Sequence, residues 1–154
     1  MFCPSRTVSL VESEEEVIKR LVYRSFEIGK NKDLQTIQSL HSKDRFSKFG
    51  DAPPYMRMDY NDACMHEELY FASVSDYDFK IGDLRIDLFD DMAIATFIIE
   101  HTGMLVDDYS FTGRTMSVRS RGTMVFQKKD SEWLIVHEHF SNIPREVKEK
   151  EEKE

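Results

Sequence analysis

The stretch from Arg119 to Pro144 constrains the fold of this chain more than any other. Two runs, residues 122–126 and 133–140, are rich in β-branched and aromatic side chains, which strands favour. The polar residues 128–132 lie between them, so the pattern predicts a β-hairpin that turns about Asp130. The second run has no wholly polar face, which predicts a strand inside a sheet rather than at its edge.

Side chains alternate between the two faces of a strand, so the second run divides into two sets. One set contains Trp133, Ile135, His137 and His139. The other contains Leu134, Val136, Glu138 and Phe140. Because both sets mix apolar and polar residues, we expect each face to meet something besides water.

The N-terminal half is typical of helices. Ser13 and Glu16 form a capping box at the start of the first helix, and Gly29 suits its C-terminal end. Asp33 is placed to begin a shorter second helix, and a third is expected from about Asp59 to Tyr70. A short strand and an irregular loop are expected between the second and third helices.

Strands follow the helices. They are expected at residues 77–89, 92–106, 117–128 and 133–143. Asp90–Asp91 and Asp107–Asp108 mark turns between them. Helices followed by a meander of strands predict an α+β domain.

Composition fits one small domain. A chain of 154 residues with 40% hydrophobic residues can bury a sizeable core. We expect residues 1–12 to be an extension, 13–144 the domain and 145–154 a charged tail. The net charge of −8 disfavours a nucleic-acid partner, since phosphate contacts need clustered basic residues. The two cysteines give no disulfide framework. No apolar run is long enough to span a membrane, and the first residues do not resemble a secretory signal. A cytoplasmic protein is therefore expected.

The run from Arg121 to Ser141, RGTMVFQKKDSEWLIVHEHFS, resembles the closing hairpin of SnoaL-like domains. These domains belong to the nuclear transport factor 2-like superfamily, with ketosteroid isomerase and the association domain of calmodulin-dependent protein kinase II. The resemblance extends through the order of elements over residues 13–144. It implies a cone-shaped α+β domain in which a curved antiparallel or mixed sheet wraps around N-terminal helices and a pocket. It implies no single function, because members differ in activity.

Two glutamates are the candidate catalytic residues, Glu100 and Glu138. Hairpins turning about Asp130 and near Phe111 would place Gly122 opposite both of them. The resemblance implies that this row faces the pocket. Burial and mutual repulsion would raise the pKa of at least one carboxyl group there, giving a general acid and a general base. The alternative is that both are partly exposed or paired with a basic residue.

The resemblance also implies the pocket wall. The candidate ligand-binding residues are Tyr55, Ile98, Met124, Phe126 and Phe140. The kinase association domain carries arginines at the positions matching Ile98, Met124 and Phe140. Because this chain lacks them, we expect an apolar ligand that is neutral or cationic rather than a carboxylate.

The outward face of the last strand predicts a homodimer. The candidate interface residues are Arg121, Trp133, Ile135, His137 and His139, an aromatic patch that a monomer would expose. The spacing of His137 and His139 also suits a metal, but too few ligands are near for zinc, so neither a metal nor a cofactor is expected. His41 and His66 are expected at the surface.

Two functions remain open from the sequence. One is a small-molecule-binding domain with an apolar pocket and acidic groups. The other is a cofactor-independent enzyme of isomerase, dehydratase or hydrolase type. Ketosteroid isomerase carries its helix tyrosine and its base at the positions of Ser25 and Phe49, with Asp51 only nearby, so steroid isomerisation is not supported.

Overall fold

Apart from one short strand, helices precede strands in a computed structural model of the chain, which describes residues 11–106 and 113–144. The elements are α1 (Glu14–Asn31), the 3-10 turn η1 (Leu34–Thr36), α2 (Ile37–Leu40), β1 (Ser47–Phe49), α3 (Tyr60–Ser73), β2 (Val74–Phe89), β3 (Met92–Val106), β4 (Gly113–Lys129) and β5 (Glu132–Asn142). The predicted turn at Asp90–Asp91 is present, whereas the one at Asp107–Asp108 and the turn near Phe111 lie outside the described residues.

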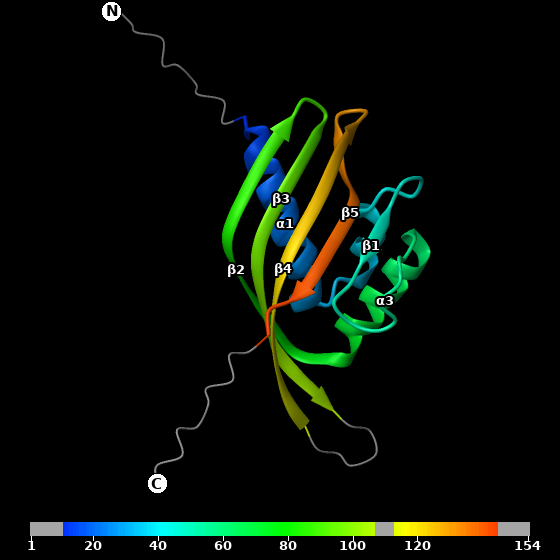
Figure 1. Cartoon of the computed structure of the whole chain (residues 1–154), viewed down its shortest axis with the longest axis vertical. Helices are drawn as coiled ribbons and strands as arrows, with labels where there is room; N and C mark the ends of the chain where they lie inside the picture. The colour runs from blue at the N-terminus through cyan, green and yellow to red at the C-terminus, as the bar shows by residue number, and fades with distance from the viewer. Residues whose placement is uncertain (1–10, 107–112, 145–154) are drawn as a thin grey trace, which may run out of the picture.

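The sheet is mixed and curved, which confirms the predicted α+β fold. Its strand order is β1-β5-β4-β3-β2, and β1 runs parallel to β5 while the other neighbours are antiparallel. Figure 1 shows α1 lying behind the long strands, with β1 and α3 at one side. β5 lies between β1 and β4, so the prediction that it is not an edge strand is correct. No helix within the described ranges is both long and apolar enough to cross a membrane.

α1 begins as predicted but ends later. Ser13 accepts a hydrogen bond from the Glu16 backbone, and the Glu16 side chain accepts one from Ser13. The helix continues past Gly29 to Asn31, and Lys32 takes the left-handed conformation after it, so the prediction that Gly29 ends the helix was wrong. Gly29 instead permits a close approach of α3, because a Cβ there would lie 2.2 Å from the ring of Phe71.

The core lies between α1 and the inner face of the sheet. Trp133 and Ile135 belong to it, with only 7% and 1% of their surface exposed. The prediction that these two residues form an interface on the outer face was therefore wrong. They pack in the same cluster as Phe26, Phe97 and Phe126.

A β-bulge in β5 explains this error. Asp130 and Ser131, both with positive φ, form the two-residue turn between β4 and β5. Phe126 pairs with Ile135, but Val125 pairs with His137, so Val136 is an extra residue in β5. The extra residue reverses the alternation along the strand. Trp133 and Ile135 therefore share the inner face with Glu138 and Phe140, while His137 and His139 face outward.

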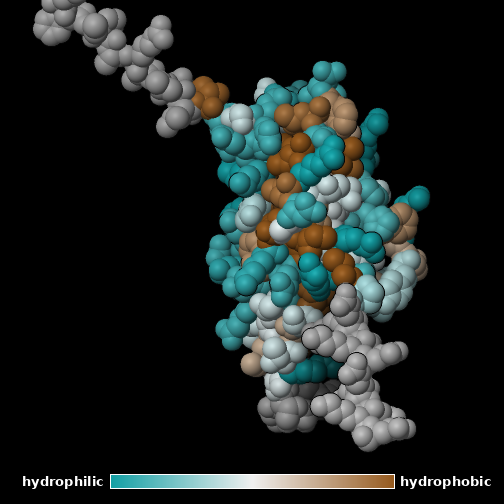
Figure 2. All heavy atoms as spheres, turned by 60° about the vertical axis from the view of Figure 1, so that its left-hand side comes forward, coloured by the Kyte–Doolittle hydropathy of each residue, from teal (hydrophilic) through white to brown (hydrophobic). Residues whose placement is uncertain are grey.

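β2 forms the other edge of the sheet. Its residues Ile81, Leu84 and Ile86 pack on the core but are only half-buried. Figure 2, which brings this side forward, shows a strip of apolar side chains between hydrophilic flanks. Two bulges interrupt the pairing of β2 with β3, next to Asp76 and Asp83, which both have positive φ. Bulges of this kind twist an edge strand and discourage pairing with another chain.

Candidate functional site

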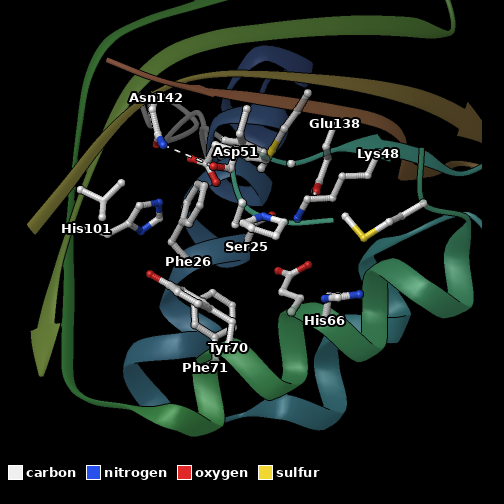
Figure 3. A pocket seen from close by; sticks show the side chains of 18 of the residues that line it. Ser25, Phe26, Lys48, Asp51, His66, Tyr70, Phe71, His101, Glu138 and Asn142 are labelled. Carbon is white, nitrogen blue, oxygen red and sulfur yellow. Dashed lines mark hydrogen bonds and ion pairs between the residues drawn. The ribbon is translucent and has the colours of Figure 1, made fainter. Parts of the chain in front are cut away.

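A cavity of about 340 Å³ lies between α1, α3, the segment after β1 and the inner face of the sheet (Figure 3). Its apolar wall includes Phe26, Met58, Tyr70, Phe71, Met124 and Phe140. Its polar lining includes Lys48, Asp51, Glu67, His101, Glu138 and Asn142. Apolar walls with a few convergent polar groups are typical of small-molecule sites.

Glu138 lies at the centre of a buried ionic cluster. Its two oxygens lie 3.2 Å from Nε2 of His41 and 3.3 Å from Nζ of Lys48. β1 pairs with β5 so that Lys48 is directly opposite Glu138 on the inner face. His41 follows the last residue of α2, and its Nδ1–H donates to the carbonyl of Ile37 in the first position of that helix, over 2.6 Å. Two cations therefore hold one carboxylate that is only 2% exposed.

The charges in this cluster shift one another's pKa. Burial alone would raise the pKa of Glu138, but the nearby Lys48 and His41 outweigh burial and hold it at about 2. Burial alone would lower the pKa of His41, but Glu138 and other partners outweigh it and raise that pKa well above its ordinary value. The pKa of Lys48 is raised for the same reason. At neutral pH, Glu138 is ionised and both of its partners are charged.

Glu67, on α3, is the least satisfied member of the site. Its Oε2 is the only buried side-chain nitrogen or oxygen without a hydrogen-bond partner among the described residues. The same atom lies 3.8 Å from Nε2 of His41. Burial raises the pKa of Glu67, and the charge of Glu138 adds to the effect, while Lys48 and His41 oppose it. A buried carboxyl group with a raised pKa and a free oxygen can exchange a proton with a bound molecule.

The spacing of His41, Glu67 and Glu138 would also suit a metal ion. One ligand atom from each lies within 4.8 Å of the others. The Nδ1–H of His41 bonds to a backbone carbonyl, as is usual for a metal-bound histidine. However, Lys48 already places a positive charge 3.3 Å from Glu138. Lys48 and protonated His41 supply two positive charges, which balance Glu138 and Glu67 even when both are ionised, so the cluster needs no ion for charge balance.

A second set of polar residues lies at another part of the cavity. Ser120 is fully buried, and its hydroxyl donates to the carboxylate of Asp51 and lies 3.2 Å from the amide oxygen of Asn142. His101 faces the cavity from β3, and its Nδ1 lies 2.5 Å from the hydroxyl of Tyr77. Figure 3 shows Asp51, Asn142 and His101 on one side of the cavity, with Lys48 and Glu138 on the other.

The predicted site residues divide between the cavity and other places. Glu138, Met124 and Phe140 line the cavity. Phe126 is fully buried in the core instead, and Tyr55 is 70% exposed in the loop after β1. The predicted register between β4 and β5 was wrong, because Gly122 pairs with Phe140 rather than Glu138. The two-residue turn and the bulge shift that register by two residues, which keeps Glu138 on the inner face.

Glu100 and Ile98 lie on the outer face, so the prediction that they face a pocket was wrong. Glu100 pairs with Arg119, and Gly122 pairs with Phe97, which is three residues from the predicted partner. An odd shift moves every side chain of a strand to the opposite face. The same shift turns His101 inward, where it lines the cavity.

Sequence reasoning missed three members of the ionic cluster: His41, Lys48 and Glu67. His41 was expected at the surface but is 3% exposed. Glu67 had a detectable pattern, since it lies four residues after Ala63 and four before Phe71, both of which are buried on the same helix. An acid on an apolar helix stripe indicates a buried carboxyl group. Lys48 and His41 gave no such pattern.

Comparisons with known proteins agree with this architecture. The SnoaL-like domain family matches residues 18–146. A nuclear transport factor 2-like superfamily protein from Salmonella enterica is similar with a TM-score of 0.70 and 17% identity, covering 86% of this chain and 93% of that one. The association domain of calmodulin-dependent protein kinase II from C. elegans is similar with a TM-score of 0.63 and 18% identity, covering 82% and 94%. At these identities, the solved structures show the fold alone. A search of curated proteins found no match.

Proposed function

Because the chain belongs to the SnoaL-like domain family, we propose that it binds a small, mostly apolar molecule in the cavity between α1, α3 and the sheet. The family fold is a scaffold for ligand binding or isomerase-type chemistry. The observation that supports binding is the Oε2 atom of Glu67, which lies at the wall of an apolar cavity of about 340 Å³ and has no hydrogen-bond partner. An unsatisfied buried polar atom is costly, and a ligand donor would satisfy it.

The charges at the cavity favour a neutral or cationic ligand. Lys48 is already paired with Glu138, so it offers little uncompensated positive charge to an anion. Asp51 and Glu67 also line the cavity, and both would repel a carboxylate when ionised. A hydroxyl or amino group on an apolar body is the chemistry that would suit Glu67.

Native mass spectrometry of protein purified from its own host tests this function. We expect a retained small molecule, and Val118→Phe should remove it, because Val118 lines the cavity. Val125→Phe adds the same bulk on the same strand, but on the outer face, so it should retain the ligand. Loss of the molecule from both variants, or from neither, would contradict binding in this cavity.

A second candidate function is cofactor-independent acid–base catalysis of isomerase, dehydratase or hydrolase type. Glu67 supports it, because its raised pKa and an oxygen without a hydrogen-bond partner suit proton transfer. Glu138 suits it less, since a carboxylate with a pKa of about 2 is a weak base at neutral pH. Once a substrate is found, Glu67→Gln should abolish turnover and Glu68→Gln, which changes an exposed neighbour, should not. Equal turnover in the two variants would exclude Glu67 as the proton-transfer group.

We also propose that the protein self-associates as a homodimer in the cytoplasm. The outer face of the sheet, with Arg121, His137 and His139, would form the interface. Ile98 and Val125 lie on this face and are only half-buried, which leaves apolar surface for a second copy to cover. The hubs and association domains among the structural neighbours fit self-association. The acidic charge gives no reason to expect nucleic acid or membrane as a partner.

A further inference from the structure

We propose that His101 determines the specificity of the cavity, and that its Nε2–H selects an apolar ligand carrying an acceptor oxygen, such as a ketone. This inference rests on the proposed ligand-binding function and names the class of ligand. His101 projects from the inner face of β3 into the cavity wall, where its ring contacts Phe26 and Tyr70 (Figure 3).

The hydroxyl of Tyr77 fixes the orientation and the tautomer of His101. The hydroxyl oxygen lies 2.5 Å from Nδ1, and the two rings are 5.6 Å apart. Burial strongly raises the pKa of Tyr77, so its hydroxyl keeps its proton. When this hydroxyl donates to Nδ1, a neutral imidazole must carry its own proton on Nε2.

The opposite tautomer of His101, with the proton on Nδ1, would leave the buried hydroxyl proton of Tyr77 without a partner. If Nδ1–H donated to Tyr77, the hydroxyl would need another acceptor, and no other described residue bonds to it. The ring of Tyr77 packs against Phe71, Phe79 and Tyr70, so its surroundings are aromatic. An unpaired buried donor is costly, so the Nε2–H tautomer is favoured.

Burial keeps the ring of His101 neutral. Burial lowers its pKa to about 4, and the positive charge of Lys48 on β1 adds to this, while Asp51 opposes it. The other titratable neighbours are Tyr77 on β2 and Tyr70 on α3, whose raised pKa values keep both uncharged. At physiological pH, the ring of His101 is therefore neutral and donates only through its Nε2–H. No described residue accepts a hydrogen bond from this group.

This donor complements Glu67. Both residues line the same cavity, Glu67 from α3 and His101 from β3. Glu67 suits a donor group of the ligand, whereas His101 suits an acceptor oxygen. An apolar molecule that carries a carbonyl oxygen would satisfy His101 without placing a negative charge near Asp51.

The tautomer is tested directly by long-range ¹H–¹⁵N NMR of the imidazole nitrogens in the full-length protein. We expect the Nε2–H pattern for His101 near neutral pH. Tyr77→Phe should convert it into a mixture of tautomers, which a purely structural role of the hydroxyl would not do. An Nδ1–H pattern in the unmodified protein would overturn the proposal.

Binding is tested with two probes of the same shape, 1-indanone and indane, which differ in the ketone oxygen. His101→Phe should weaken indanone binding roughly tenfold, as expected for the loss of one hydrogen bond, and should leave indane binding unchanged. The carbonyl stretch of bound indanone should move to lower frequency in the unmodified protein but not in His101→Phe. Tyr77→Phe should reduce the indanone affinity by a smaller factor.

The outcomes separate this inference from the proposed function. If both probes bind and His101→Phe weakens them equally or not at all, the cavity binds small molecules but His101 does not select an oxygen. If neither probe binds to the unmodified protein, the cavity does not bind molecules of this class and both proposals fail. Circular dichroism of each variant separates a lost contact from a lost fold.

Discussion

Replacing Glu138 with glutamine tests the buried ionic cluster. The side chain keeps its shape but loses its charge, which leaves Lys48 and His41 without their main counter-ion. Its pKa is lowered from 4.5 to about 2, which corresponds to about 3 kcal/mol of stability at neutral pH. Removing one partner of a buried ion pair typically costs a similar amount of stability, about 3–5 kcal/mol. We therefore expect Glu138→Gln to lower the free energy of unfolding by about 3 kcal/mol.

The pH dependence gives the same variant a second test. A carboxyl group whose folded pKa is depressed stabilises the protein above its unfolded pKa, and this contribution is lost as pH falls toward the folded pKa. The difference between unmodified protein and Glu138→Gln should therefore shrink from about 3 kcal/mol near neutral pH to about 1 kcal/mol at about pH 3.

Urea unfolding at several pH values measures this difference. Glu132→Gln changes an exposed glutamate on the same strand and should shift stability by less than about 0.5 kcal/mol. A loss below about 1 kcal/mol for Glu138→Gln at neutral pH would refute the reasoning. A difference that does not shrink with acid would refute the assigned pKa shift.

Three further predictions concern packing, capping and assembly. Gly29→Ala should lower the thermal midpoint and cost about 1–3 kcal/mol of stability, because the new methyl group would overlap the ring of Phe71. Helix propensity alone predicts a gain of about 1 kcal/mol, so the sign of the stability change distinguishes the two effects. Ser13→Ala should cost about 1 kcal/mol in urea unfolding through loss of the capping box, and Ser13→Asp should restore most of it. Val125→Glu should shift sedimentation from dimer to monomer, and a monomeric unmodified protein would contradict the outer-face interface.

The sequence predicted the elements well because they depend on local patterns. The capping box at Ser13, the apolar spacing of α1 and the turn at Asp90–Asp91 act over a few residues. The hairpin of β4 and β5 was also predicted, since its strands are rich in β-branched and aromatic residues. Neighbouring residues alone determine such features.

The faces of the strands could not be predicted in the same way. The inner face of β3 depends on its register against β4, which differs by three residues from the predicted one, and that of β5 depends on the extra residue Val136. Neither is marked by a residue type, and an error of one residue exchanges the two faces. The cluster of His41, Lys48 and Glu138 joins residues 97 positions apart at its widest, so no local pattern indicates it.

β1 has only three residues, and this length has a consequence for how the cavity opens. Lys48 exchanges backbone hydrogen bonds with Met58, and among the described strands of the sheet β1 pairs with β5 alone. Short edge strands open locally at lower free energy than the centre of a sheet. Hydrogen exchange at the amides of β1 should therefore be faster than at those of β4. A molecule that enters by this route would slow exchange at β1 first, so protection there would report occupancy before any change in global stability.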